Sequence, residues 1–185
     1  MYEDGGVGEA ADRVRSEILR EFVWTGGHAD FAAILRSPAV VETIGEALAT
    51  PFKERAVSVV IGIEARGFIF AALAARALGV GLVLARKAGS VHPGSEVETA
   101  THPDWRGRHL VMRVSAKAVQ AGDELLLFDD WVETGSQATT VARLVGRLGG
   151  EVIGVSAVVD DAPDHVRIAL NLVGLVRSSE LPTDA

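Results

Sequence analysis

Apolar residues gather in short continuous runs along the chain, and these runs predict strands. A strand that is buried on both faces of a parallel sheet reads as a near-continuous stretch of apolar, often β-branched residues. Four runs fit this description, at residues 56–63 (AVSVVIGI), 81–87 (GLVLARK), 123–130 (DELLLFDD) and 151–161 (EVIGVSAVVDD). Residues 109–115 (HLVMRVS) alternate like a half-exposed strand, and residues 170–176 (LNLVGLV) predict a short final strand.

Between these runs, apolar residues recur at helical spacing. Residues 11–21, 38–49, 67–78 and 136–148 are expected to form helices. Ser37 precedes Pro38, which suits an N-cap followed by proline in the first turn. The alanine-rich segment 67–78 is apolar nearly all round, which is typical of a buried helix, and Gly79 is expected to end it.

This alternation of strands and helices predicts an open α/β fold with a mostly parallel twisted sheet flanked by helices. We expect a single domain over residues 1–185, because we find no repeat and no second domain. Residues 1–10 consist largely of loop-forming residues and are expected to be flexible. Residues 88–106 contain few apolar side chains, and a loop of this length inside a domain predicts a functional lid.

The composition narrows the class of protein. Hydrophobic residues make up 48% of the chain and charged residues 23%, as in a globular domain. The net charge of −7 without a basic cluster argues against nucleic-acid binding, and the lack of cysteine excludes disulfides and thiolate metal sites. The acidic N-terminus does not resemble a signal peptide, and no apolar run has transmembrane length. We therefore expect a cytoplasmic protein that does not bind membranes.

Charged and glycine-rich segments follow three of the predicted parallel strands. They are EARG (64–67), RKAG (86–89) and DDWVETGS (129–136). The carboxyl ends of parallel strands lie at one edge of the sheet, where open α/β sheets bind their ligands. The sequence therefore predicts a ligand site built from these three segments.

The segment DDWVETGS indicates a sugar-phosphate site. Backbone N–H groups around Gly135 and the start of the next helix form a concave donor site for a phosphate. Asp129 and Asp130 would repel that phosphate, but they can accept hydrogen bonds from sugar hydroxyls beside it. The alternative is that two acids simply end a strand and that Thr-Gly-Ser caps a helix.

Cations at the same edge could neutralise a second anionic group. Arg66, Arg86 and Lys87 supply positive charge, and Gly67 allows the backbone to approach a ligand closely. Charged residues at strand ends are also often solvated, so this alternative stays open.

Two of these segments resemble a known family. LLLFDDWVETGS (125–136) resembles the phosphoribosyl pyrophosphate (PRPP) signature of type I phosphoribosyltransferases. Residues 59–89 are similar to the adenine phosphoribosyltransferase pattern, in which an acid-x-Arg-Gly-Phe segment precedes an Arg-Lys-x-Gly loop. Weaker similarity continues over roughly residues 20–177, and GSQA (135–138) is closer to xanthine phosphoribosyltransferases.

The chain also departs from that pattern. Ala29 stands where the family has Arg before the retained Asp30, and Ser90 stands where its pyrophosphate loop has Lys. Gln137 replaces the usual Thr, and Glu133 replaces the Ala of adenine enzymes. These differences leave the acceptor base open.

The resemblance implies a fold with a small N-terminal hood and transfer of ribose 5-phosphate from PRPP to a purine base, adenine or another, with release of pyrophosphate. It implies Mg²⁺ bound through PRPP rather than by direct protein ligands, with water-mediated contacts to Asp129 and Asp130 left open. It also implies a homodimer.

The same resemblance assigns candidate roles to residues. Asp129, Asp130 and Glu133 are the candidate catalytic groups, although Glu133 on a turn can equally be a bystander. Trp131 can contact the sugar or base, or pack in the core. The expected contacts are Glu133, Thr134, Gly135, Ser136 and Gln137 for the 5-phosphate, Arg66, Gly67, Arg86 and Lys87 for pyrophosphate, and Phe22, Asp30 and Trp131 for the base.

Two alternative functions stay open at this point. The chain could be a non-catalytic sensor of PRPP or nucleotides, or it could transfer phosphoribosyl groups to a non-purine acceptor in specialised metabolism.

Overall fold

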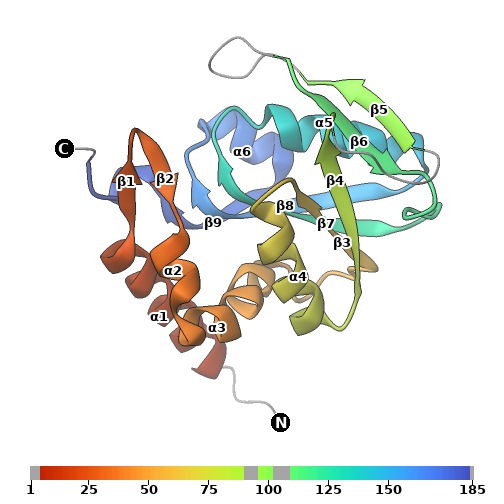
Figure 1. Ribbon diagram of the computed structural model, residues 1–185. Coiled ribbons are helices and arrows are strands. Elements are labelled where there is room, and N and C mark those ends of the chain that lie inside the picture. Colours follow the sequence, from red (N-terminus) through yellow and green to blue (C-terminus); the bar gives the residue numbers. More distant parts are fainter. Residues whose placement is uncertain (1–4, 90–95, 102–108, 184–185) are drawn as a thin grey trace.

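A seven-stranded sheet forms the centre of the molecule (Figure 1); the computed structural model describes residues 5–89, 96–101 and 109–183. The strand order is β5-β6-β4-β3-β7-β8-β9. Strands β4, β3, β7, β8 and β9 run parallel, and β6 is antiparallel to both β4 and β5. This confirms the predicted open and mostly parallel α/β sheet. The strands are β3 (Val59–Ile63), β4 (Gly81–Lys87), β5 (Glu96–Ala100), β6 (Val111–Ser115), β7 (Glu124–Val132), β8 (Glu151–Asp160) and β9 (Leu172–Arg177).

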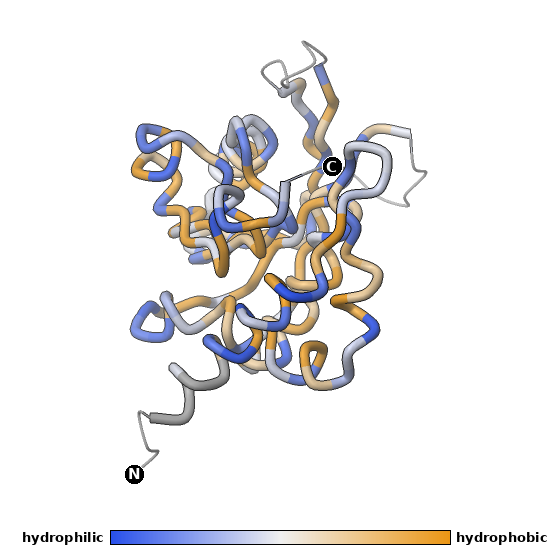
Figure 2. Tube along the Cα trace, turned by 90° about the vertical axis from the view of Figure 1, so that its left-hand side faces the viewer, coloured by the Kyte–Doolittle hydropathy of each residue, from blue (hydrophilic) through white to orange (hydrophobic). Residues whose placement is uncertain are grey.

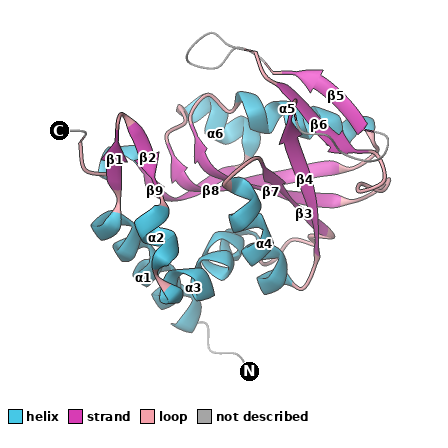
Figure 3. Ribbon diagram, in the orientation of Figure 1, coloured by secondary structure: helices cyan, strands magenta, loops and turns pink. Residues whose placement is uncertain are grey.

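Helices cover both faces of this sheet (Figure 3). Alternate strand residues point to opposite faces, so Val60 and Leu126 join one apolar core while Ile61 and Leu127 join the other. Figure 2 shows apolar residues along the central segments and polar residues on the outer turns. The first core includes residues of α1 (Gly5–Glu21), α3 (Pro38–Ala49) and α4 (Gly67–Leu78), and the second those of α5 (Ser136–Arg147) and α6 (Asp164–Leu170).

A small N-terminal hood stands at the β9 side of the sheet (Figure 1). It consists of the hairpin β1 (Val23–Thr25) and β2 (His28–Asp30), followed by α2 (Ala32–Arg36). Gly26 and Gly27 both have positive φ, 58° and 74°, which a two-residue hairpin turn of this hand requires. The sequence pattern indicated only a break at this point, and the strands on either side are too short to be read from it.

Two expected helix starts differ in detail. Helix α1 begins at Gly5 rather than at residue 11, so residues 5–10 are helical although we expected them to be flexible. Ser37 occupies the predicted N-cap position of α3, but its hydroxyl donates to Glu17 Oε1 (2.9 Å) and not to the helix backbone. The seven-residue helix α6 was not predicted at all.

Two expected strand and loop boundaries also differ. Strand β7 continues past the two acids to Val132, because Trp131 and Val132 pair with Val159 and Asp160 of β8. The segment 88–106, expected to be a loop, contains β5, which pairs with β6. Residues 90–95 and 102–106 of the expected lid lie outside the described residues.

The close approach of α3 to α4 yields a stability prediction. A Cβ at Gly45 would lie 2.4 Å from the carbonyl carbon of Leu73. We expect Gly45→Ala to lower the free energy of unfolding by about 1–3 kcal/mol, because backbone atoms cannot move away as a flexible side chain can. Chemical denaturation measures this change.

The matched control is Gly146→Ala in α5, where an added Cβ meets nothing within 4 Å. That substitution should stabilise the protein by up to about 1 kcal/mol through helix propensity. Equal effects at the two positions would contradict the packing argument.

Candidate active site

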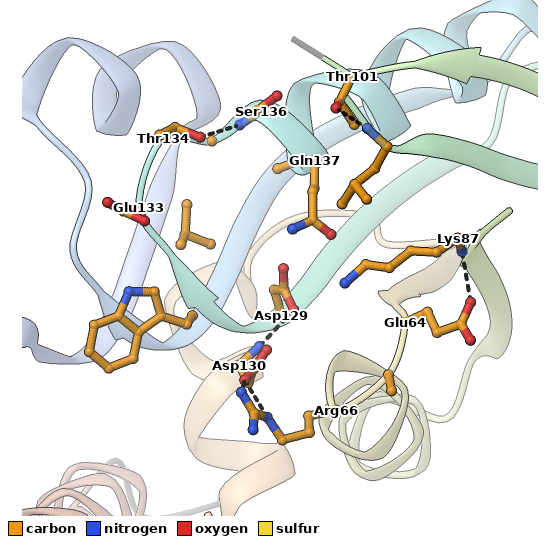
Figure 4. Close-up of a pocket in the computed structure, with 16 residues that line it drawn as sticks. Glu64, Arg66, Lys87, Thr101, Asp129, Asp130, Glu133, Thr134, Ser136 and Gln137 are labelled. Carbon is orange, nitrogen blue, oxygen red and sulfur yellow. Dashed lines mark hydrogen bonds and ion pairs between the residues drawn. The ribbon is translucent and has the colours of Figure 1, made fainter. Parts of the chain in front are cut away.

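The three predicted segments meet around one pocket at the carboxyl ends of β3, β4 and β7 (Figure 4). Its volume is about 410 Å³, within the usual range for a small-molecule site. The parallel arrangement of the three strands brings these segments together, as the sequence predicted. The lining consists of Glu64, Ala65, Arg66, Lys87, Thr101, Leu110, Asp129, Asp130, Trp131, Val132, Glu133, Thr134, Gly135, Ser136, Gln137 and Ala138.

A sharp turn joins β7 to α5 on one side of this pocket. Gly135 has φ 66° in the left-handed region, and a Cβ there would lie 2.6 Å from Val166 Cγ1 and 2.8 Å from Leu170 Cδ1. The Ser136 N–H donates to Thr134 Oγ1 (3.3 Å). The first amides of a helix have no intrahelical acceptor, and the helix dipole is positive at this end. The turn can therefore hold an anion, and α6 enforces its shape.

Asp129 lies at the base of the pocket with 6% of its surface exposed. Its Oδ1 accepts the Asp130 N–H (2.9 Å), and a Cβ at Gly67 would lie 3.1 Å from the same oxygen. Burial raises the pKa of Asp129 well above its usual value, and the neighbouring charge of Asp130 raises it further. This carboxyl group therefore holds a proton more tightly than an exposed aspartate does.

Asp130 is held by Arg66. The Arg66 Nε atom donates to Asp130 Oδ2 (2.5 Å), while Nη1 donates to the carbonyl oxygen of Ala29 in the hood (3.3 Å). The guanidinium carbon also lies 5.0 Å from the centre of the Phe31 ring. Arg66 thus connects the hood to the acid pair, and its expected contact with pyrophosphate stays a prediction.

Glu64 organises the opposite wall of the pocket. Its Oε2 accepts the Lys87 N–H (2.7 Å), which joins the end of β4 to the turn after β3 (Figure 4). The peptide bond between Glu64 and Ala65 is cis. The sequence interpretation included Glu64 in EARG but gave it no role. A carboxylate at the end of a buried strand was the signal that could have identified it.

Thr101 and Leu110 were also missed. They lie at the ends of the β5–β6 arm, where the Leu110 N–H donates to Thr101 Oγ1 (3.0 Å). Thr101 is 4% exposed. Its segment was expected to be a lid without regular structure, so no periodic pattern indicated that it would reach the pocket.

Two residues that were predicted to bind pyrophosphate are not among the described residues that line the pocket. Gly67 begins α4 behind Asp129, and a Cβ there would also lie 2.8 Å from the Phe128 carbonyl oxygen. The Arg86 guanidinium lies 5.6 Å from the centre of the Phe68 ring. Their roles in binding pyrophosphate stay predictions.

The three predicted base-contacting residues lie on the hood side. Trp131 lines the pocket, and its Nε1 donates to Asp161 Oδ2 (3.3 Å). Phe22 is 2% exposed and packs in the aromatic core, with its ring 6.4 Å from that of Trp131. Asp30 accepts the Ala32 N–H through Oδ1 (2.8 Å), which shapes the start of α2. Of the three, Trp131 alone borders the pocket as the described residues define it.

Comparisons with known proteins identify the class to which this fold and site belong. The family model described as phosphoribosyl transferase domain matches residues 30–169. The adenine phosphoribosyltransferase of Anaeromyxobacter sp. strain Fw109-5 is 35% identical over 131 residues, 71% of this chain and 72% of that protein. The enzyme of the same name from Serratia proteamaculans is 34% identical over 146 residues, 79% of this chain and 72% of that protein.

Solved structures give the same result. Adenine phosphoribosyltransferase from Rhodothermus marinus superposes with a TM-score of 0.76 at 26% identity, covering 92% of this chain and 99% of that one. The Saccharomyces cerevisiae enzyme, solved with an imino-altritol bisphosphate and adenine, superposes with a TM-score of 0.75 at 27% identity, covering 89% and 99%. The chain belongs to the phosphoribosyltransferase family and is an enzyme of that class. Within the family, these relatives are adenine phosphoribosyltransferases.

Within the described residues, none of the helices combines the length and apolar character needed to cross a membrane. The same residues contain no cluster of three or more His, Asp or Glu side chains that could hold a metal ion.

The buried carboxyl group yields a prediction on pH. The raised pKa of Asp129 means that its contribution to stability is fully present below the unfolded pKa and is lost as the pH rises through the folded pKa. Asn cannot ionise and can still accept the Asp130 N–H, so Asp129→Asn should unfold at a higher temperature than wild type at about pH 8. The difference in unfolding temperature between the variant and wild type should narrow toward about pH 4. Thermal unfolding across this pH range measures it.

Asp12→Asn, at an exposed acid of α1, is the control for the removal of one negative charge. A gap for Asp129→Asn that stays constant with pH, or a lower unfolding temperature at about pH 8, would contradict the assignment.

Proposed function

We propose that this enzyme transfers the 5-phosphoribosyl group of PRPP to a purine base, with adenine as the first candidate, and releases pyrophosphate. One observation carries the proposal: the Gly135 turn at the start of α5 and the acid pair Asp129–Asp130 line the same pocket. An anion-binding turn beside two hydroxyl acceptors suits a pentose 5-phosphate. The names of the relatives support the choice of adenine.

The turn from Glu133 to Gln137 is proposed to bind the 5-phosphate. Backbone N–H groups at the start of α5 would donate to the phosphate oxygens, with the Thr134 and Ser136 hydroxyls beside them. The left-handed conformation at Gly135 gives the turn the concave shape that this requires.

Asp129 and Asp130 are proposed to hold the ribose hydroxyls. The transition state of phosphoribosyl transfer places positive charge on the ribose ring and negative charge on pyrophosphate. Fixed carboxylates near the sugar stabilise that positive charge, and positioning keeps the ring in line with the incoming base. A sugar hydroxyl bound at Asp130 Oδ2 would compete with Arg66, because this oxygen accepts from the guanidinium.

The departing pyrophosphate is proposed to meet Lys87 and the released Arg66, which line the pocket on the opposite wall. Gly67 and Arg86 lie behind this wall. Gly67 would influence its shape, and Arg86 would influence its charge. Residues 88–106 are proposed to close over the site, because excluding water protects PRPP from hydrolysis.

The donor set suits Mg²⁺ held mainly by PRPP. Asp129 and Asp130 offer hard carboxylate oxygens, and no cluster of three metal-ligating side chains is present among residues 5–89, 96–101 and 109–183. When bound, Mg²⁺ would neutralise charge on the leaving pyrophosphate. The two acids would contact the hydrated ion through water.

The base is proposed to bind beside Trp131, on the side of the pocket that faces the hood. The Trp131 indole lies 5.7 Å from that of Trp24 in the hood hairpin, and Asp161 fixes its N–H. Phe22 would support this aromatic surface from behind, and Asp30 would fix the hood backbone at α2. Glu133 is proposed as a backbone contact to the phosphate, with proton transfer to or from the base as its second candidate role.

The oligomeric state and the cellular location of the enzyme are also part of the proposal. Ile69 and Leu82 are 42% and 39% exposed, which supplies apolar surface on α4 and β4 for a homodimer contact. The net charge of −7 argues against binding to nucleic acid or to anionic membranes. Action in the cytoplasm is also part of the proposal.

Removal of the acid pair tests the ribose role. We expect the double variant Asp129→Asn, Asp130→Asn to lower PRPP turnover roughly 10²- to 10³-fold or more, because neutral amides do not stabilise a cationic sugar. Pyrophosphate release measures turnover, and circular dichroism verifies the fold. Asp164→Asn, at a 91% exposed acid of α6, is the matched control and should keep wild-type turnover. A double variant that turns over PRPP at the wild-type rate would disprove the ribose role.

A panel of nucleobases tests the acceptor. With PRPP and Mg²⁺ present, we expect adenine to release pyrophosphate faster than hypoxanthine, guanine, xanthine or pyrimidines do. Tight PRPP binding without release by any base would instead identify a sensor. Release only with a non-purine acceptor would assign the enzyme to another pathway.

A further inference from the structure

The side chain of Gln137 has a polar atom that no described residue satisfies. Its Oε1 is buried and accepts no hydrogen bond from any described residue, a condition that only Thr140 Oγ1 shares within the described chain. Gln137 lies in the first turn of α5 and lines the pocket. Figure 4 shows its side chain directed from the start of α5 toward the side of the pocket where Asp129 and Lys87 lie.

A buried carbonyl oxygen without a donor is unfavourable, and native proteins rarely keep one without a reason. The terminal torsion of glutamine has broad minima, so the carboxamide can turn without a large rotamer cost. Because Oε1 gives up no protein hydrogen bond when it turns, a ligand that supplies a donor gains the full benefit of the contact.

The chemistry of the ligand decides which group can supply that donor. Ionised phosphate and pyrophosphate oxygens accept hydrogen bonds but do not donate them, whereas a sugar hydroxyl does both. Gln137 lies between the Gly135 turn, proposed to hold the 5-phosphate, and Asp129 at the base of the pocket. The sugar ring of a pentose 5-phosphate would occupy the space between them.

We propose that the Gln137 side chain accepts a hydrogen bond from one hydroxyl of the ribose ring and so selects the hydroxylated sugar. This inference rests on the proposed function. It assigns to the side chain a role separate from any contact that the backbone N–H of residue 137 makes with the phosphate. Gln137 would thus be a specificity-determining residue that acts beside the acid pair.

Calorimetry with ribose 5-phosphate, 2-deoxyribose 5-phosphate and 3-deoxyribose 5-phosphate tests the proposal. The measurements use the full chain without divalent metal, so that no hydrated cation supplies the donor. Gln137→Met keeps the length of the side chain and removes its acceptor. We expect this variant to bind ribose 5-phosphate roughly tenfold more weakly than wild type does. One of the two deoxy sugars should bind wild type and variant equally, because it lacks the hydroxyl in question.

The chain's other glutamine supplies the matched control. Gln120→Met, in the exposed turn before β7, should bind all three sugar phosphates as wild type does. Equal weakening of all three ligands by Gln137→Met would overturn the proposal in favour of a phosphate contact. Unchanged affinity for ribose 5-phosphate would overturn it as well.

A second variant covers the case in which Gln137→Met does not fold. Gln137→Glu keeps an acceptor oxygen and removes the amide donor, so it should still bind ribose 5-phosphate more tightly than the deoxy sugar. Loss of that preference would contradict the proposal. Failure of wild type to bind ribose 5-phosphate would instead count against the proposed function, which separates the two claims.

Discussion

Burial of the Asp129 carboxyl group within β7 is the constraint on which the pocket depends. The four residues before it in the strand, Leu125, Leu126, Leu127 and Phe128, are apolar and fully buried. A charged group that follows such residues is costly to bury unless it is hydrogen-bonded or neutralised. The close approach at Gly67 and the bond from the Asp130 N–H keep Asp129 in this position. The unfavourable burial of Asp129 thus places its two carboxyl oxygens at a fixed position at the base of the pocket.

The remaining elements hold other charges and dipoles at fixed positions around the base of the pocket. Arg66 fixes the second acid and ties it to the hood, and Glu64 joins the turn after β3 to the end of β4. The helix dipole of α5 faces the pocket from above the Gly135 turn. Groups of both signs therefore line one cavity, which suits a ligand that combines anionic groups with hydroxyl donors.

The sequence predicted where the pocket lies because parallel topology brings the strand ends to a common edge. Apolar runs identified β3, β4, β7 and β8, and the polar residues that follow three of them became the lining. The sequence did not indicate Thr101 or Leu110 as lining residues. The hydrophobic pattern of the antiparallel β5–β6 arm does not show which part of the molecule the arm lies beside. Nor could the sequence show that Arg66 would bind Asp130, since the choice of partner depends on side-chain rotamers. The short helix α6 was invisible for a related reason, as it has no fully buried residue to establish a period.

Helix α6 illustrates how the pocket is connected to the rest of the molecule. Its residues Val166 and Leu170 fill the space that a Cβ at Gly135 would need, while Ile168 on the outer side is 81% exposed. Enlarging either inner side chain would press it against the backbone turn at Gly135, where the space is already filled. Changing Ile168 alters only a surface that water already reaches. Mutational tolerance within this one short helix therefore differs between its two faces, and a library confined to its inner positions would reshape the turn at Gly135 without replacing any residue of that turn.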